Sequence, residues 1–211
     1  MDQQPMLQPL LTAVDDVLAT AAMDHELAEL HAIGRSVTES AGVQAVDPSC
    51  PPLLADLLAE VETDHLHSPD RRLVEELVTH ASHLRWLHPY PDYDERDIVD
   101  FRERYFYTTI VGSRDDGTAP LFSDRFSLFL TVQGPQVFYP SHVHKAPEFY
   151  RTIAGTGEWQ KGGGPFAATP PGRWIVHPTG TRHAMRSLDS PMVALAVWTN
   201  DLDSVPVIVR N

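Results

Sequence analysis

Basic residues, cysteine and long hydrophobic runs are scarce in this 211-residue sequence, and each shortage excludes a class of protein. Asp and Glu outnumber Lys and Arg by 29 to 16, which argues against nucleic acid and anionic membrane surfaces as partners, because both require concentrated positive charge. No apolar run approaches the roughly 18 residues that cross a bilayer, so we expect a globular chain with no membrane span.

Cysteine occurs once, at Cys50, so the chain cannot form an internal disulfide, which fits a reducing compartment. The mildly apolar residues 9–22 include Asp15 and Asp16, and no basic residue precedes them. This pattern is unlike a secretory signal. We therefore expect a cytoplasmic protein.

The excess of acidic residues is confined to the first half of the chain. Residues 1–110 hold 21 acidic and 7 basic residues, whereas residues 111–211 hold 8 and 9. Apolar residues in the first half recur at three- and four-residue spacing, which predicts helices. We expect an N-terminal helical lobe over residues 1–104.

Three helical patterns make up this lobe. The first begins at Leu10 and the second at Leu54. The third runs from Leu73 to Leu87, with Ser68 as the expected N-cap and a proline after it. A segment rich in proline and aspartate, PYPDYDERDI, then connects the lobe to the rest of the chain.

From residue 105 onward the sequence has short β-branched and aromatic runs broken by glycine and proline. Seven of them read YFYTTIVG, FSLFLTVQG, VFYPSHVH, EFYRTIAG, GRWIVH, MVALAVW and VPVIV. Short strands at close spacing predict an antiparallel sandwich or small barrel over residues 105–211. The GGG at 162–164 has no Lys-Ser/Thr after it, so it indicates a hairpin turn and not a phosphate loop. The fold class is therefore α+β.

One of these runs concentrates side chains that bind metals. Along an extended strand, residues at even separations share a face, so His142 pairs with His144 and Glu148 pairs with Tyr150, and we expect the four side chains to converge on one face of the strand. Further along, His183 follows a Pro-Thr-Gly turn. Imidazoles with a carboxylate suit Zn²⁺, Fe²⁺, Mn²⁺ or Ni²⁺ without choosing among them.

Most histidines of the chain are not predicted to bind a metal. The chain has 11, and seven lie in the helical half without a partner pattern, namely His25, His31, His65, His67, His80, His83 and His88. His177, before Pro178, has the wrong spacing from His183 for an obvious ligand. We interpret it as structural or as a neighbour of the ligands.

The spacing of the metal-binding candidates resembles that of a known protein family. HVHKAPEFYRTIAG contains His142-x-His144, three residues, Glu148, six residues and then Gly155. This arrangement resembles the first motif of the cupins.

A second stretch, GRWIVHPTGTRH, contains Gly172, five residues, Pro178-x-Gly180, two residues and His183. It resembles the second cupin motif and begins 16 residues after the first ends. The two motifs in this order imply a single antiparallel β-barrel of the cupin jelly-roll type.

Further residues narrow the resemblance. Tyr150 follows the glutamate by two positions, Tyr139 precedes His142 by three, and Trp198 stands at the end of a late strand-like run. With the helical extension, they resemble the cupin-type dimethylsulfoniopropionate (DMSP) lyases of the DddQ, DddL and DddW type. The resemblance implies metal-dependent β-elimination of DMSP to dimethyl sulfide and acrylate.

The same resemblance implies a role for each residue. It makes His142, His144, Glu148 and His183 the ligands of one divalent transition-metal ion, and Tyr150 the general base. A tyrosine has an ordinary pKa of about 10, so a nearby cation is needed to favour the phenolate.

The expected substrate is a small zwitterion with a carboxylate and a positively charged sulfonium group. An aromatic face holds such a cation, so Trp198 and Tyr139 are the substrate-binding candidates. In MVALAVW, the small residues Ala194 and Ala196 alternate with larger ones. If this small face points inward, it leaves room for a ligand beside Trp198.

Two other functions fit the same residues. One is a cupin dioxygenase or isomerase acting on another small carboxylic acid with the same ligands. The other is a non-catalytic cupin that senses a ligand or metal, with the helical half binding a protein. The sequence also leaves open whether the helical lobe is a lid, a homodimer interface or both.

Overall fold

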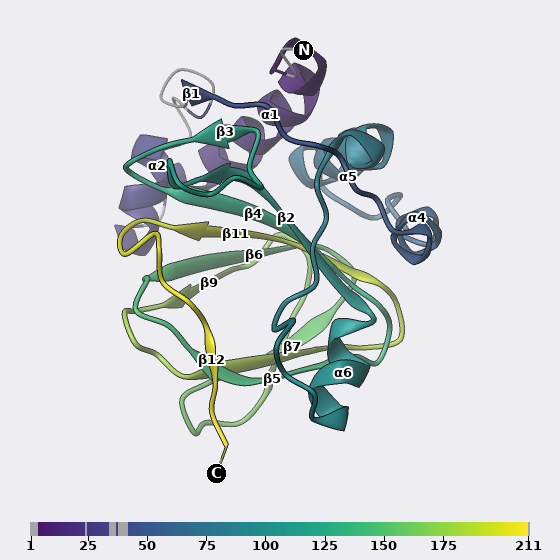
Figure 1. Ribbon diagram of the computed structural model, residues 1–211, viewed down its shortest axis with the longest axis vertical. Helices are drawn as coiled ribbons and strands as arrows, with labels where there is room; N and C mark the ends of the chain where they lie inside the picture. The colour runs from purple at the N-terminus through teal and green to yellow at the C-terminus, as the bar shows by residue number, and fades with distance from the viewer. Residues whose placement is uncertain (1–3, 24, 34–36, 38–41, 211) are drawn as a thin grey trace.

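The computed structural model describes residues 4–23, 25–33, 37 and 42–210 (Figure 1). Its α-helices all precede the main strands: α1 (Gln4–Ala19), α2 (Ala28–Ile33), α4 (Pro52–Ala59), α5 (Ser68–His80) and α6 (Arg96–Arg102). Short 3₁₀ turns cover Thr20–Met23, His25–Leu27 and Ala81–His83. None of the helices in these ranges is long and apolar enough to cross a membrane.

The strands form two sheets. Seven strands make the larger sheet, in the order β1 (Gly42–Val43), β3 (Leu121–Phe122), β2 (Tyr105–Gly112), β4 (Ser127–Gln133), β11 (Met192–Trp198), β6 (Glu148–Ala154) and β9 (Trp174–His177). The smaller sheet contains β12 (Val207–Ile208), β5 (Phe138–Val143), β10 (His183–Ser187), β7 (Gly157–Lys161) and β8 (Ala167–Thr169). Neighbouring strands are antiparallel except β2 and β3. The chain thus has the expected α+β class and cupin jelly roll, built as a sandwich and not as a closed barrel.

Strand β11 shows how the layers are held together. Val193, Leu195 and Val197 belong to a buried apolar cluster that includes the inner faces of the helices. Ala194 and Ala196 belong to a second cluster, between the two sheets. The small face of β11 therefore points between the sheets, which meets the condition set for a ligand space beside Trp198. The division into a helical lobe and a barrel domain stays a prediction, since helices and sheet share the first cluster.

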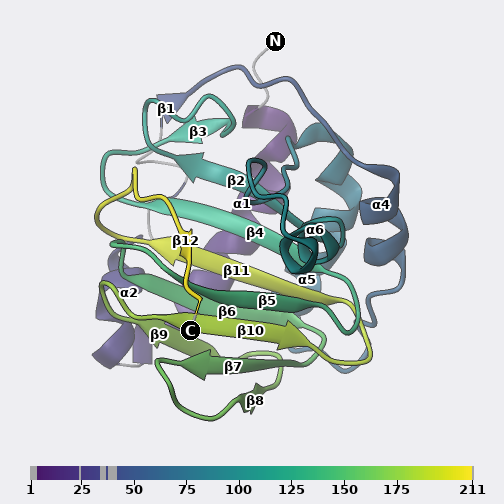
Figure 2. The same cartoon turned by 60° about the horizontal axis from the view of Figure 1, so that its bottom comes forward.

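The arrangement in space follows from these two clusters. In Figure 1, helices α1 and α5 lie toward the upper end of the molecule, α4 lies at its right-hand side, and β5, β7 and β12 lie in the lower part. Helix α6 contacts β2 of one sheet and β5 of the other. Figure 2 shows the yellow C-terminal segment leaving β11 and returning to β12, which pairs with β5. This segment links the larger sheet to the smaller one.

The third predicted helix is shorter than its apolar pattern. Helix α5 ends at His80, and its N-cap is His67, so the predictions of Ser68 as N-cap and of helix up to Leu87 were wrong. Leu84 is extended, and Leu87 forms an antiparallel bridge with Tyr107. Spacing alone cannot distinguish these buried residues from a further helical turn. The predicted hairpin at 162–164 is confirmed, since β7 and β8 flank it as an antiparallel pair.

Candidate metal centre

The two predicted pairs of site residues lie on either side of a crossing between the two sheets. His142 lies in β5 of the smaller sheet, and Glu148 and Tyr150 lie in β6 of the larger one. His144 stands in the loop between them. The prediction that both pairs share one strand face is therefore wrong in detail, because the chain crosses between the sheets here. The two pairs nevertheless face the same space, since all four side chains line one cavity.

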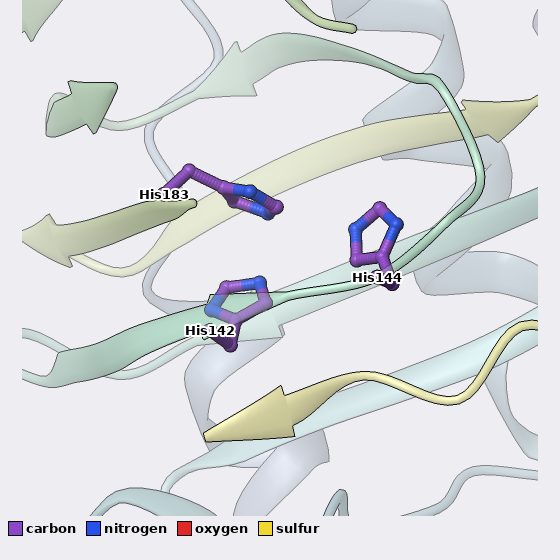
Figure 3. Close-up of side chains that lie close together, drawn as sticks. All are labelled: His142, His144 and His183. Carbon is purple, nitrogen blue, oxygen red and sulfur yellow. The ribbon is translucent and has the colours of Figure 1, made fainter. Parts of the chain in front are cut away.

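His183 completes the group from β10, where it pairs with His142 across the sheet. One ring nitrogen of each of His142, His144 and His183 lies within 4.8 Å of the others (Figure 3). All three histidines are buried. The turn that precedes β10 contains Gly180, whose φ of 68° lies in the left-handed region that glycine adopts without strain. This turn delivers His183 to the site.

The backbone fixes which nitrogen of each ring is available. The Nδ1 atoms of His142 and His144 donate to the carbonyls of Pro140 and Ala146, both at 2.9 Å. Nδ1 of His183 donates to a carbonyl in the same way. A ring whose Nδ1 carries the proton keeps the lone pair on Nε2, which is the usual state of a metal-bound histidine.

Glu148 supplies an oxygen to the same point. Its Oε2 atom lies 3.1 Å from Nε2 of His144 and 3.1 Å from Nε2 of His183. Burial opposes ionisation of this carboxyl, but the interactions with the two histidines outweigh burial and hold its pKa well below the usual range. In the metal-free chain a proton shared with these ring nitrogens holds the contact, and a divalent cation bound to the same atoms would replace that proton.

These groups fit a divalent cation. A carboxylate oxygen and imidazole lone pairs are all acceptors, and Nε2 of His183 has no hydrogen-bond partner of good geometry among the described residues. Burial, followed by the nearby His183, lowers the pKa of His142 well below 6.5, so this ring is neutral. Neutral imidazoles with one carboxylate are a typical ligand set for zinc, iron, manganese or nickel.

The site opens into a cavity of about 630 Å³. Aromatic rings form much of its wall: Tyr90, Tyr93, Tyr105, Tyr107, Phe129, Tyr139, Tyr150 and Trp198. Four aspartates also line it, namely Asp92, Asp115, Asp116 and Asp203. None of the lining residues is Lys or Arg. A bound carboxylate would therefore find no lysine or arginine among the described residues of this wall.

Tyrosine hydroxyls are paired within the cavity. Tyr150 shares a hydrogen bond with Tyr105, and the hydroxyls of Tyr90 and Tyr139 are 2.9 Å apart. Burial, and then the negative charge of Glu148, raises the pKa of Tyr150 well above 10. Without a cation, Tyr150 is therefore a neutral phenol.

The two predicted substrate-binding residues also touch the ligands. The ring of Tyr139 stacks on His142, with centroids 4.0 Å apart. The indole of Trp198 lies 4.7 Å from the His144 ring, and its Nε1 donates to Oε1 of Glu148 at 2.8 Å. This last contact is absent from the sequence-based prediction.

His177 lies beside the ligands without joining them. Its ring stacks on that of His183, with centroids 4.1 Å apart. Neither ring nitrogen has a hydrogen-bond partner among the described residues. Burial and the neighbouring His183 lower the pKa of His177 to about 3, so its ring is neutral.

Sequence reasoning missed the cavity residues that come from outside the motifs. Tyr90 and Tyr93 belong to the segment interpreted only as a connector, and residues 202–207 belong to the C-terminal segment. Tyr90 has a left-handed backbone, with φ of 55°, and Arg102 donates to its carbonyl at 2.8 Å. The aromatic content of the connector was the one available signal.

Comparison with known proteins finds similarity to dimethylsulfoniopropionate lyases. A family model described as dimethylsulfoniopropionate lyase matches residues 25–194. The curated "Dimethylsulfoniopropionate lyase DddQ" of Ruegeria pomeroyi is 33% identical over 110 residues. That match covers 52% of this chain and 53% of the relative, so the chain spans about half the length of the relative it matches.

Solved structures agree in fold. The crystal structure of DMSP lyase DddQ from Ruegeria pomeroyi has a TM-score of 0.72 at 24% identity, covering 92% of this chain and 96% of that one. A structure reported with the DMSP lyases RdDddP and RnDddQII has a TM-score of 0.70 at 23% identity, covering 94% and 100%. The shared architecture thus extends across the helices as well as the sandwich.

Proposed function

Because this chain belongs to the dimethylsulfoniopropionate lyase family, we propose that it is a metal-dependent carbon–sulfur lyase. The proposed reaction removes a proton from the carbon next to the carboxylate of DMSP and breaks the bond between the next carbon and sulfur. The electron pair of the C–H bond forms the carbon–carbon double bond, and that of the C–S bond leaves with sulfur. The products are dimethyl sulfide, acrylate and a proton.

One observation carries the proposal. Three buried imidazoles and the Glu148 carboxylate converge beside an aromatic cavity whose described lining contains no Lys or Arg. We propose His142, His144, Glu148 and His183 as the ligands of one divalent ion. A bound divalent ion would hold the substrate carboxylate and offset the negative charge that builds on it during proton removal.

Tyr150 is proposed as the general base. It lies on the same face of β6 as Glu148 and lines the cavity. Its raised pKa means that the metal-free chain keeps it protonated. A divalent charge near the phenol reverses this preference, which makes base activity dependent on a loaded site.

The aromatic wall is proposed to hold the sulfonium. Trp198 and Tyr139 line the cavity and are the proposed contacts of the cation, and the aspartates of the wall add negative charge. A zwitterion would then bind with its carboxylate at the ligand group and its cationic end toward the aromatic rings. This orientation would present the carbon next to the substrate carboxylate to Tyr150.

The test is an assay of dimethyl sulfide by gas chromatography, with purified protein, DMSP and each of Fe²⁺, Mn²⁺, Zn²⁺ and Ni²⁺. We expect release with at least one metal and loss of release with a chelator. Tyr150→Phe should lower the rate by about 10²-fold or more while metal content, measured by elemental analysis, is unchanged. Dimethyl sulfide release by Tyr150→Phe at the wild-type rate would contradict the role of Tyr150 as base.

A further inference from the structure

The carboxylate of Glu148 is held differently at its two oxygens. Oε2 faces the imidazoles of His144 and His183, whereas Oε1 accepts the indole N–H of Trp198 at 2.8 Å. Both residues are buried, with Glu148 3% and Trp198 8% exposed. The hydrogen bond is therefore protected from competition with water. Hydrogen bonds are stronger in such a buried environment than in water.

We propose that Trp198 is a positioning residue that orients Glu148 through its indole N–H, so that a single carboxylate oxygen faces the metal. This inference rests on the proposed ligand set. A carboxylate can offer one or both oxygens to a cation. When one oxygen carries a buried hydrogen bond, the other remains for the metal, and space is left for the carboxylate of a substrate.

The geometry of the two strands supports this role. Trp198 of β11 and Glu148 of β6 are directly paired neighbours in the larger sheet. The indole is held from two sides, by the rings of Phe129 at 5.0 Å and His144 at 4.7 Å. Its N–H therefore has little freedom to leave the carboxylate. Mutation of a residue that hydrogen-bonds to a metal ligand in this way commonly lowers metal affinity by about 10- to 100-fold.

The chain provides a matched control in Trp159. This indole is also buried among the residues between the two sheets, but its Nε1 has no hydrogen-bond partner among the described residues. Trp159→Phe and Trp198→Phe therefore remove the same atoms from similar surroundings. Only the second substitution removes a hydrogen bond to a proposed ligand.

The experiment measures Zn²⁺ affinity of the chelator-stripped protein by competition with a chromophoric chelator, and records the visible spectrum of the Co²⁺-loaded protein. Trp198→Phe should bind Zn²⁺ at least about tenfold more weakly and change the Co²⁺ spectrum, whereas Trp159→Phe should do neither. If Trp198→Phe does not fold, 3-benzothienylalanine at position 198 retains the fused ring and has a sulfur atom, which cannot donate, in place of the N–H. Wild-type affinity and spectrum in the folded variant would overturn the proposal.

A double-mutant cycle with Glu148→Gln separates this inference from the proposed ligand set. Since Trp198 is argued to act through the carboxylate, adding Trp198→Phe to Glu148→Gln should change Zn²⁺ affinity by less than about twofold. An undiminished effect of Trp198→Phe in that background would overturn the inference. Wild-type Zn²⁺ affinity of Glu148→Gln alone would instead overturn Glu148 as a ligand, and the inference with it.

Discussion

Arg151 of β6 and Asp70 of α5 form a buried ion pair with two parallel hydrogen bonds. Nε to Oδ1 and Nη2 to Oδ2 are both 2.9 Å, and the side chains are 6% and 1% exposed. Arg151 also donates to the carbonyl of Gly172 at 2.8 Å. Because Arg151 follows Tyr150 in the strand, this pair ties the helices to the opposite face of the strand that carries the candidate base.

Asp70→Asn should destabilise the fold substantially. It leaves the buried Arg151 charge without its partner, and such losses cost about 3–5 kcal/mol. The measurement is the free energy of unfolding in urea. Asp16→Asn is the control, because Asp16 and Arg72 form an ion pair with side chains 47% and 45% exposed. It should cost less than about 1 kcal/mol, and equal losses in the two variants would contradict the importance of the buried pair.

Much of the sandwich could be predicted because its strands are short and bounded by turn residues. The runs beginning at Tyr105 and Met192 correspond to β2 and β11 at both ends. Alternation also placed Ala194 and Ala196 on one face of the strand, and this face lies between the sheets. These successes depend on local signals, namely period-two burial and glycine or proline at turns.

Contacts between distant segments could not be predicted in the same way. Asp70 appears in the sequence as one more acidic residue of a helical half, and nothing local marks it as the partner of Arg151. The hydrogen bond from Trp198 to Glu148 likewise depends on how β6 and β11 align. Period-two alternation assigns a side chain to a face of the sheet, but it does not determine which atom of the facing strand it meets.

Substitution of the candidate ligands tests the metal centre without any substrate. His142→Ala, His144→Ala and His183→Ala should each lower Zn²⁺ affinity and reduce the rise in melting temperature that Zn²⁺ gives the wild-type chain, because metal binding stabilises only the folded state. The measurements are elemental analysis after dialysis and thermal unfolding with and without Zn²⁺.

The control for these three variants is His83→Ala, since His83 is exposed in the 3₁₀ turn after α5. It should keep both the wild-type metal content and the wild-type rise in melting temperature. Full metal content in all three ligand variants would contradict the site.

The charge of the cavity wall predicts which ligands it prefers. With Asp203 and three other aspartates in the wall and no Lys or Arg, a cationic head group should be favoured over a neutral one. The trimethylammonium analogue of DMSP should therefore inhibit about tenfold more strongly than 3-(methylsulfanyl)propionate, whose sulfur is neutral. Inhibition constants against DMSP give the measurement. Asp203→Asn should narrow the difference, and equal inhibition of the wild type by both compounds would contradict the prediction.

His177 should make the metal-free chain less stable in mild acid. Burial lowers its pKa to about 3 in the folded chain, against an ordinary value near 6.5 when unfolded. Below pH 6.5 the unfolded chain therefore binds a proton that the folded chain does not. Well below pH 6.5, His177 should lower the free energy of unfolding by about 1.4 kcal/mol for each further unit of pH. This loss should end near pH 3, where the folded chain also binds the proton. The full contribution of His177 to stability is present above pH 6.5.

The variant His177→Phe isolates this contribution. It removes the titrating group and two buried nitrogens without hydrogen-bond partners, and it keeps a flat ring against His183. In urea unfolding at pH 7.5, 6.5 and 5.5, the free energy of unfolding should fall by about 1.4 kcal/mol less in His177→Phe than in the wild type over the whole range, because the unfolded chain takes up this proton around pH 6.5. The exposed His83, replaced by Ala, should leave the slope unchanged. An identical slope in His177→Phe and the wild type would mean that the folded chain accepts the proton as readily as the unfolded one, and burial would then not be what keeps the ring beside His183 neutral.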